Sequence, residues 1–110
     1  MKVVILPEVL DYMEDLMEIL YQEEYFGFRE SASEYVIDLL DNVKANLPTR
    51  QHKRAPELFA RYGNDLHYAS FVKNKRTTWY AFFTKYQDKG ENTIYLVRYI
   101  ANNHTVAQHL

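Results

Sequence analysis

Residues 66–101 read LHYASFVKNKRTTWYAFFTKYQDKGENTIYLVRYIA, and this stretch decides the fold. Runs rich in aromatic and β-branched residues, at 66–73, 77–86 and 93–101, are typical of β-strands. The links between them, NKR and QDKGEN, are short, and short links join antiparallel neighbours in a sheet. The stretch therefore predicts a three-stranded antiparallel meander.

A further strand and a first helix are predicted ahead of this meander. Residues 2–6, KVVIL, form a short run that contains β-branched residues and favours a strand. Pro7 suits the first turn of a helix, and apolar residues then recur at helical spacing among acidic ones. We expect this helix to extend to about residue 25 and to end near Gly27.

A second helix is expected to start at the sequence SASE. Ser31 and Glu34 have the spacing of a capping box, in which each side chain satisfies a free amide at the helix start. Pro48 should end this helix, and the two helices should form an antiparallel hairpin. The predicted fold class is α+β, with an N-terminal strand, a helical hairpin and the meander, all strands forming one sheet.

The sheet is predicted to have two apolar faces. Along the run 77–86, one face receives Trp79, Ala81 and Phe83 and the other receives Tyr80, Phe82 and Thr84. The hairpin covers one face, so the second should be covered in part by the tail or by a partner. ELFARYG, ahead of the meander, is expected to form one helical turn closed by Gly63.

The C-terminal segment NNHTVAQHL is expected to leave the sheet at about Asn102. It should form a short C-terminal helix or tail, because asparagine favours turns and caps. Val106 and Leu110 are four residues apart and should pack back on the core. His104 would then lie at the end of the last strand, on the rim of a basic surface near Arg76.

Length and composition limit the class of protein. At 110 residues the chain has room for one domain, residues 1–110. Hydrophobic residues make up 47% and aromatic residues 15%, which is typical of a globular protein. The absence of cysteine excludes disulfides and thiolate metal sites and agrees with a cytoplasmic protein. The apolar run near the N-terminus is too short for a signal peptide or a membrane span, so we expect no membrane association.

Charge is distributed unevenly along the chain. Residues 1–48 hold eleven acidic and three basic side chains, a balance of −8. Residues 49–110 hold four acidic and ten basic side chains, a balance of +6. Two interpretations stay open: the basic half attracts a phosphate backbone, or the acidic helices pair with a basic sheet inside the molecule.

The chain resembles the RelE/ParE superfamily of small bacterial toxins over nearly all of its length. The resemblance rests on the order of elements and on VVILPEVLDYMEDLMEIL, FVKNKRTTWYAFFTKY and RYIANNHTVAQHL. It implies a toxin encoded with a protein antitoxin, which either cleaves mRNA on the ribosome and inhibits translation or poisons DNA gyrase; some members have no established activity. Ribonuclease members usually carry arginine or lysine on the first two strands of the meander. Here Thr78, Trp79 and Tyr80 stand where a strand arginine is expected, and Arg76 lies in the preceding turn.

Ribonuclease members often carry a histidine, arginine or tyrosine after the last strand, and His104 lies at about that place. Metal-independent RNA cleavage needs an acid and a base, and cations that stabilise the charged phosphorane. His104 is the leading acid/base candidate, and Arg76 is the cation predicted to act beside it. The alternative for His104 is a capping or surface role. His109 is assigned no catalytic role, because it falls near the free C-terminus.

Further basic residues are candidates for contact with RNA or phosphate. Lys73 and Arg98 are predicted phosphate clamps. Arg98 alternates with Leu96 and Ile100 and so faces one side of its strand, where a structural ion pair with an acidic helix residue is the alternative. The loop 50–54 contains Lys53 and Arg54 among four basic or histidine side chains. It is predicted either to contact an RNA backbone or to be a mobile, solvated loop.

Tyr80 and Phe82 are predicted to stack on bases or to belong to the core or to an antitoxin interface. No metal or cofactor is expected, because His104 and His109 are five residues apart and no cysteine or carboxylate set joins them. Two functional hypotheses remain: a toxin that is a metal-independent mRNA endoribonuclease, and a family member without catalysis. The second is either a gyrase inhibitor or a degenerate, antitoxin-binding protein.

Overall fold

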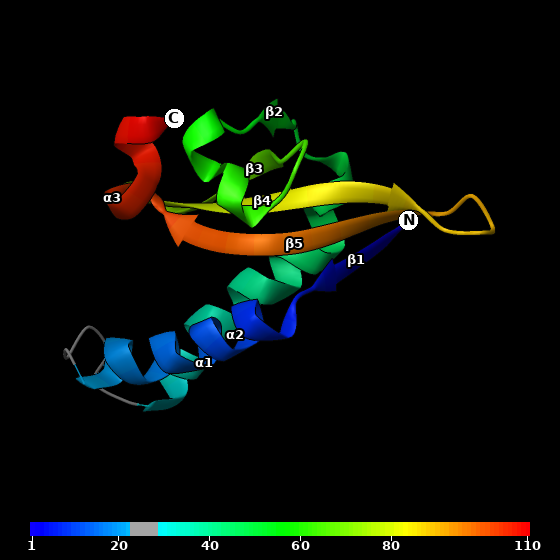
Figure 1. The fold of residues 1–110 in the computed structure, drawn as a ribbon. Coiled ribbons are helices and arrows are strands. Elements are labelled where there is room, and N and C mark those ends of the chain that lie inside the picture. Colours follow the sequence, from blue (N-terminus) through cyan, green and yellow to red (C-terminus); the bar gives the residue numbers. More distant parts are fainter. Residues whose placement is uncertain (23–28) are drawn as a thin grey trace.

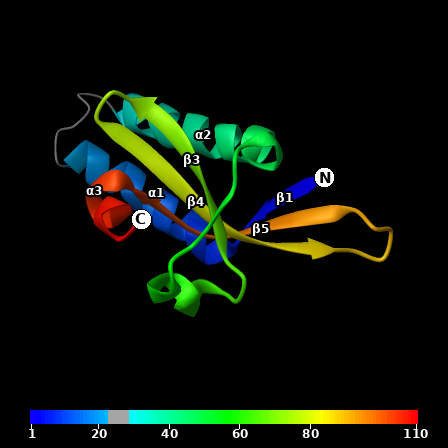
Figure 2. The same ribbon diagram turned by 90° about the horizontal axis from the view of Figure 1, so that it is seen from above.

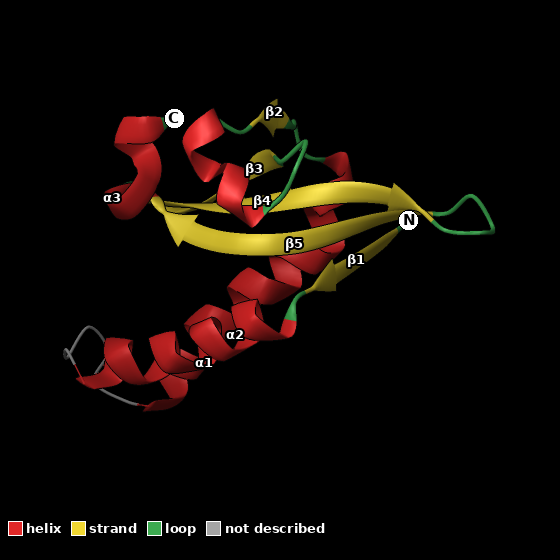
Figure 3. Ribbon diagram, viewed as in Figure 1, coloured by secondary structure: helices red, strands yellow, loops and turns green. Residues whose placement is uncertain are grey.

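The computed structural model describes residues 1–22 and 29–110, and its fold is α+β (Figures 1 and 3). The elements along the chain are β1 (Lys2–Ile5), α1 (Pro7–Gln22), α2 (Arg29–Asn46), β2 (Lys53–Arg54), β3 (His67–Asn74), β4 (Thr77–Gln87), β5 (Thr93–Asn102) and α3 (Asn103–Val106). Short 3₁₀ turns are η1 (Leu47–Thr49), η2 (Glu57–Tyr62) and η3 (Ala107–His109).

The strands form one mixed sheet in the order β1-β5-β4-β3-β2. The pairs β5–β4, β4–β3 and β3–β2 are antiparallel, which confirms the predicted meander, and β1 pairs in parallel with β5. The sheet has five strands where the sequence predicted four. The additional strand, β2, pairs Lys53 with Tyr68 and Arg54 with His67. Two basic residues carry no strand signal of their own, so this pairing depends on the partner strand.

The helical hairpin is confirmed, with one correction at the start of α2. The predicted end of the first helix near Gly27 lies outside the described residues. The predicted cap at Ser31 is wrong, because α2 already includes Arg29 and Ser31 lies inside the helix. The end of α2 is as predicted, since the chain passes into η1 with Pro48 near its start.

One core lies between the hairpin and the sheet. Figure 1 shows α1 and α2 together below the sheet, and both contribute fully buried side chains. The residues of this core with the least exposure are Met13, Val36, Val43, Leu47, Phe71, Phe83 and Val97. Burying each such side chain stabilises the fold by about 1.5–3 kcal/mol.

The opposite face of the sheet carries a second, smaller core. Figure 1 shows η2, between β2 and β3, and α3 above this face. Phe59 of η2 and Val106 of α3 are buried there against Phe82, whose ring stacks on Phe59 at a centroid distance of 4.8 Å. The expectation that the tail covers part of the second face is therefore confirmed, and η2 covers another part. Figure 2 shows both elements from above, with α3 at the end of β5 and η2 separate from it.

A β-bulge interrupts β5. Phe82 of β4 pairs with Tyr99, but the next residue, Phe83, pairs with Val97, so Arg98 has no partner on β4. The additional residue changes which face the following side chains occupy. Val97 and Ile100 both belong to the core beneath the hairpin. Arg98 and Tyr99 are consecutive, and both lie toward the second face.

Candidate functional site

Two asparagines at the end of β5 position the start of α3. Oδ1 of Asn102 accepts from the backbone N–H of His104 over 3.0 Å, which is a side-chain cap. Asn103 crosses to the β3–β4 turn: its Oδ1 accepts from the N–H of Thr78 and its Nδ2 donates to the carbonyl of Arg76, both over 3.1 Å. The predicted turn at Asn102 is confirmed. His104 and the turn that carries Arg76 are therefore held close together in space.

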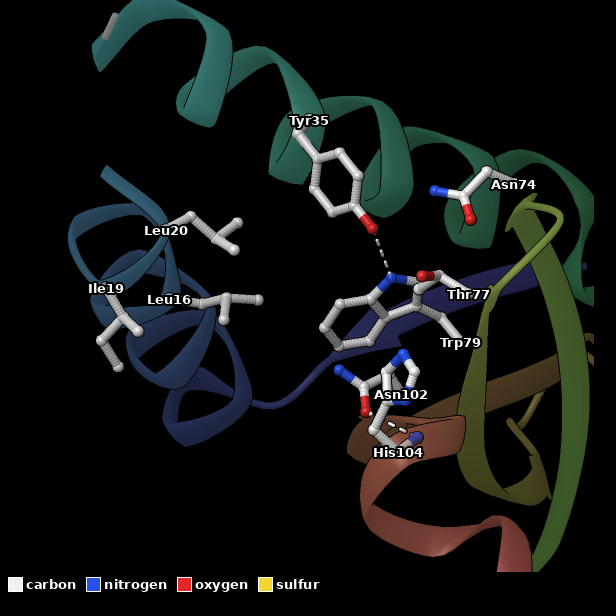
Figure 4. Close-up of a pocket in the computed structure, with 9 residues that line it drawn as sticks. All are labelled: Leu16, Ile19, Leu20, Tyr35, Asn74, Thr77, Trp79, Asn102 and His104. Carbon is white, nitrogen blue, oxygen red and sulfur yellow. Dashed lines mark hydrogen bonds between the residues drawn. The ribbon is translucent and has the colours of Figure 1, made fainter. Parts of the chain in front are cut away.

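The cavity beside His104 is formed by segments from distant parts of the chain (Figure 4). It encloses about 510 Å³ between the helical hairpin and the ends of β4 and β5. Its lining residues are Leu16, Ile19, Leu20, Tyr35, Asn74, Thr77, Trp79, Asn102 and His104. A volume of this size is in the range of small-molecule sites.

A hydrogen bond joins the two aromatic residues of this cavity. The indole Nε1 of Trp79, on β4, donates to the hydroxyl of Tyr35, on α2, over 3.0 Å. Lys73 lies near the same ring, with its Nζ 4.6 Å from the centroid of Tyr35. A lysine at this distance makes a cation–π contact, which places a positive charge beside Tyr35, although Lys73 itself does not line the cavity.

The tail orients His104 but leaves its side chain accessible. His104 is exposed, whereas Val106 is 3% exposed and packs in the second core, as predicted. Leu110 does not complete the expected apolar pair, since it is 37% exposed. The chain after Val106 continues as the 3₁₀ turn η3, so Leu110 does not repeat the direction of Val106 as an α-helix would require. His109 is exposed, and its Nε2 lies 3.2 Å from Nε2 of Gln108.

The structure does not bring Arg98 together with His104. The Nε of Arg98 donates to the hydroxyl of Thr84 over 2.9 Å, and a terminal nitrogen donates to the hydroxyl of Tyr86 over 2.5 Å. These partners lie on the face opposite the helices. The alternative of an ion pair with an acidic helix residue is therefore wrong, because Arg98 lies on the face opposite Val97, which packs beneath the hairpin. Hydrogen bonds from Thr84 and from Arg98 lower the pKa of the exposed Tyr86 hydroxyl.

The basic loop is built into the fold. Lys53 and Arg54 are exposed on β2, and Arg54 lies 3.4 Å from Asp65 in a surface ion pair. His52 packs edge-on against the ring of Phe83, and its Nε2 lies 2.8 Å from the carbonyl of Leu47. Lys53 and Arg54 are solvated, as the second interpretation of this loop predicted, while strand pairing and the His52 contacts connect the loop to the sheet. Whether Lys53 and Arg54 contact RNA stays a prediction.

Tyr80 and Phe82 differ in accessibility although both point to the second face. Phe82 is fully buried beneath Phe59 and Tyr99, so its ring is unavailable to a partner in this arrangement. Tyr80 is half-buried and contacts the ring of Tyr68 at a centroid distance of 5.9 Å. Phe82 is therefore a core residue, which was one of its predicted alternatives. Part of the Tyr80 side chain stays accessible to a partner.

Sequence reasoning did not identify Tyr35, Asn74 or the cavity itself. Tyr35 and Trp79 are 44 residues apart, and neither occurs in a motif that predicts their contact. Asn74 ends β3 in a way that is also typical of an ordinary turn residue. Lys73, the basic residue beside Asn74, was identified as a phosphate clamp, and that prediction pointed to this region.

Among the described residues, no group of three or more histidine, cysteine, aspartate or glutamate side chains could hold a metal ion. Within the same residues, 1–22 and 29–110, no helix is long and apolar enough to cross a membrane. Comparison with known proteins found no matching family model, no matching curated protein and no matching solved structure.

Proposed function

We propose that this protein is a RelE/ParE-like toxin of a bacterial toxin–antitoxin module, acting in the cytoplasm as a metal-independent mRNA endoribonuclease that inhibits translation. The observation that carries the proposal is the position of His104. Its side chain is exposed beside a cavity, and Asn103 holds the adjacent backbone against the turn that carries Arg76. Lys73 contacts the ring of Tyr35, which lines the same cavity.

In this proposal the 2′-OH of a ribose attacks the neighbouring phosphate and the 5′-oxygen leaves. His104 transfers a proton in one of these two steps. Arg76 and Lys73 stabilise the negative charge of the phosphorane. Lys53 and Arg54, which are exposed on β2, contact the backbone of the RNA. Such contacts weaken as the salt concentration rises.

The position of Arg98 favours a second candidate, a family member without catalysis. Arg98 binds Thr84 and Tyr86 toward the other end of β4 from the end that pairs with Asn102 beside His104, so one of the predicted clamps is absent from this site. β4 also lacks an arginine in the segment Thr78–Tyr80. Such a protein would inhibit gyrase or bind only an antitoxin.

The proposed partner is a protein antitoxin that contacts the accessible surface around Tyr80. Acidic residues of the antitoxin would meet Arg76 and Lys73, and an apolar anchor would contact Tyr80. Phe82 is left out of this interface because it is buried. A pull-down with the product of the neighbouring gene tests this partner.

Expression of the protein in a bacterium, with mapping of mRNA 5′ ends, tests the catalytic proposal. We expect growth arrest and new ends within translated messages. Normal growth and intact messages, with folded protein present at high level, would rule the nuclease out. Inhibition of DNA supercoiling by the purified protein, with messages intact, would instead identify a gyrase inhibitor.

A further inference from the structure

The side of β3 that faces away from β4 is an open sheet edge over part of its length. The N–H of Ala55 donates to the carbonyl of Leu66 over 2.9 Å, so the backbone groups of Leu66 point away from β4. These directions alternate from residue to residue along an antiparallel strand. The N–H and C=O groups of Ser70 and Val72 therefore point to the same side as those of Leu66.

The short strand β2 covers only the first part of this edge. Its first residue, Lys53, pairs with Tyr68, and β2 does not reach Ser70. Within the part of the chain that the structure describes, Ser70 and Val72 have strand partners on β4 alone. Both residues are exposed, and a β-bulge between Val72 and Asn74 ends the open stretch. Two N–H groups and two carbonyl groups thus face outward without a partner strand.

An edge of this kind is a template for a further strand. Edge strands are often protected by a charged residue or a proline, but the two outward positions here carry a serine and a valine. Val72 is 71% exposed, so it offers apolar area beside the unpaired backbone groups. An extended segment that bonds to such an edge gains affinity from its backbone and specificity from alternate side chains.

The surroundings of this edge are basic. Segments 50–54 and 64–76, which flank it, contain one acidic residue, Asp65, and that carboxylate lies 3.4 Å from Arg54. The same segments contain six basic residues, which are Arg50, Lys53, Arg54, Lys73, Lys75 and Arg76. A segment that binds along the edge therefore enters a positive potential, which favours acidic side chains.

The two faces of the edge differ in chemistry. On the face toward the hairpin, Cζ of Arg50 lies 5.0 Å from the ring centroid of Phe71, and Nζ of Lys73 lies 4.6 Å from that of Tyr35. On the other face, Val72 is exposed on the side of the second core. Side chains of an added strand point to the two faces alternately. Acidic residues would meet the cations, and apolar residues would meet Val72.

We propose that the edge of β3 at Ser70 and Val72 binds an extended segment of a partner protein, in which acidic and apolar residues alternate, as a sixth strand of the sheet. A second copy of this chain does not fit, because pairing β3 with itself brings two basic edges together. RNA uses the cations, but its phosphate oxygens only accept hydrogen bonds and leave the outward carbonyls unpaired. The inference goes beyond the proposed function, because such a segment binds whether or not the protein cleaves RNA.

A hexapeptide of alternating glutamate and valine, acetylated and amidated at its ends, tests the proposal on the full chain. Hydrogen exchange measured by NMR should show that the amide protons of Ser70 and Val72 exchange rapidly in the free protein. Their exchange should slow about tenfold when about nine-tenths of the protein has peptide bound. The same peptide with N-methyl groups on its alternate amides lacks donors for the ladder and should give no protection.

Val72→Pro removes one outward donor. Proline is tolerated on an edge strand where its missing N–H faces solvent, so pairing with β4 should persist. Peptide binding should weaken about tenfold or more, because the ring also blocks close approach of a partner strand. Val72→Thr keeps the N–H and the β-branched shape and is the matched control, which should lose less than about threefold.

Lys75→Glu tests the role of charge without altering the edge itself. Lys75 is exposed in the turn after β3, and its reversal should weaken peptide binding about two- to fivefold at low salt, as expected for one exposed ion pair. Lys89→Glu makes the same change of charge in the exposed turn between β4 and β5 and should leave binding unchanged. A peptide of alternating lysine and valine should bind at least about tenfold more weakly than the acidic one.

Unprotected Ser70 and Val72 amides at saturating acidic peptide would overturn the proposal. So would unchanged binding by a folded Val72→Pro variant, or equal binding of the acidic and basic peptides. A short single-stranded RNA that protects the same two amides would assign the edge to nucleic acid instead. Concentration-dependent protection of these amides without any peptide would assign it to a second copy. None of these measurements depends on mRNA cleavage, so the nuclease proposal stands or falls separately.

Discussion

The indole nitrogen of Trp79 donates to the hydroxyl of Tyr35 over 3.0 Å and so connects the sheet to α2 beside the cavity. Trp79 is only 3% exposed, so water does not readily replace this acceptor. We expect Tyr35→Phe to lower the free energy of unfolding by about 1–3 kcal/mol, because a buried donor loses its partner. Urea denaturation followed by the fluorescence of Trp79 measures the loss. Tyr12→Phe, on the exposed part of α1, should change the stability by less than about 0.5 kcal/mol; an equal loss in both variants would contradict the prediction.

His104→Ala should reduce RNA cleavage by about 10²–10⁴-fold if His104 transfers a proton. The fold should persist, since the side chain is exposed and the cap of α3 uses the backbone N–H. Growth of expressing cells and end mapping of messages measure the effect, with circular dichroism as the check on folding. His109→Ala is the matched control and should retain activity. Full toxicity of His104→Ala would leave His104 with a surface role.

Gly63→Ala should destabilise the protein by about 1–3 kcal/mol. Gly63 has a φ of +156°, and an added Cβ would lie 2.9 Å from Cδ of Arg98. Both the backbone and Arg98 would have to adjust. Gly90→Ala is the control, because its Cβ would meet atoms only at 3.5 Å and beyond. Thermal unfolding of the two variants compares their stability. Similar melting temperatures would show that position 63 accommodates alanine without strain.

Tyr86 should ionise at a lower pH than an unperturbed tyrosine. Hydrogen bonds from Thr84 and Arg98 favour its phenolate, so its pKa lies below the usual value of 10.0. Folding then gains stability as the pH rises from the lowered pKa toward 10, keeps that gain above pH 10, and loses it as the pH falls through the lowered pKa. Phenolate absorbance rises during a pH titration as tyrosines ionise, and in Tyr86→Phe the step that belongs to Tyr86 should be absent. Arg98→Met should move that step to higher pH, and an unchanged titration would contradict the assigned cause.

Phe82→Ala should lower the free energy of unfolding by about 3–5 kcal/mol, because it opens a cavity in the second core. Tyr80→Ala should destabilise the protein less, since Tyr80 is only half-buried. Antitoxin affinity should respond in the opposite order, with a loss of about 1–3 kcal/mol for Tyr80→Ala. Chemical denaturation and calorimetric titration separate the two effects. Unchanged antitoxin binding by Tyr80→Ala would place the interface elsewhere.

The meander could be predicted from the sequence because its strands carry strong local signals. Each of its three predicted strands agrees with the structure to within about one residue at either end. β2 could not be predicted, since Lys53 and Arg54 pair only because β3 offers an edge. The predicted alternation of side chains along β5 also failed after Arg98. The additional residue there places Ile100 on the opposite face of the sheet from Arg98.

The candidate site was predictable only in part, for a related reason. The caps at Asn102 and the exposure of His104 follow from local preferences of asparagine for turns. The cavity depends on Tyr35 reaching Trp79 across 44 residues, and no local pattern encodes that contact. Residues whose role depends on the local sequence, such as Asn102, could be predicted. Residues that meet only through tertiary packing, such as Tyr35 and Trp79, could not.

The parallel pairing of β1 with β5 sets an order of events during synthesis of the chain. Residues 2–5 are translated long before residues 94–97, with which they pair. β1 therefore has no partner in the sheet until residues 94–97 have been translated. Contacts of such wide sequence separation slow folding. A growing chain would expose the apolar side of the helical hairpin until β3, β4 and β5 have been translated, so the main core would form only after that point.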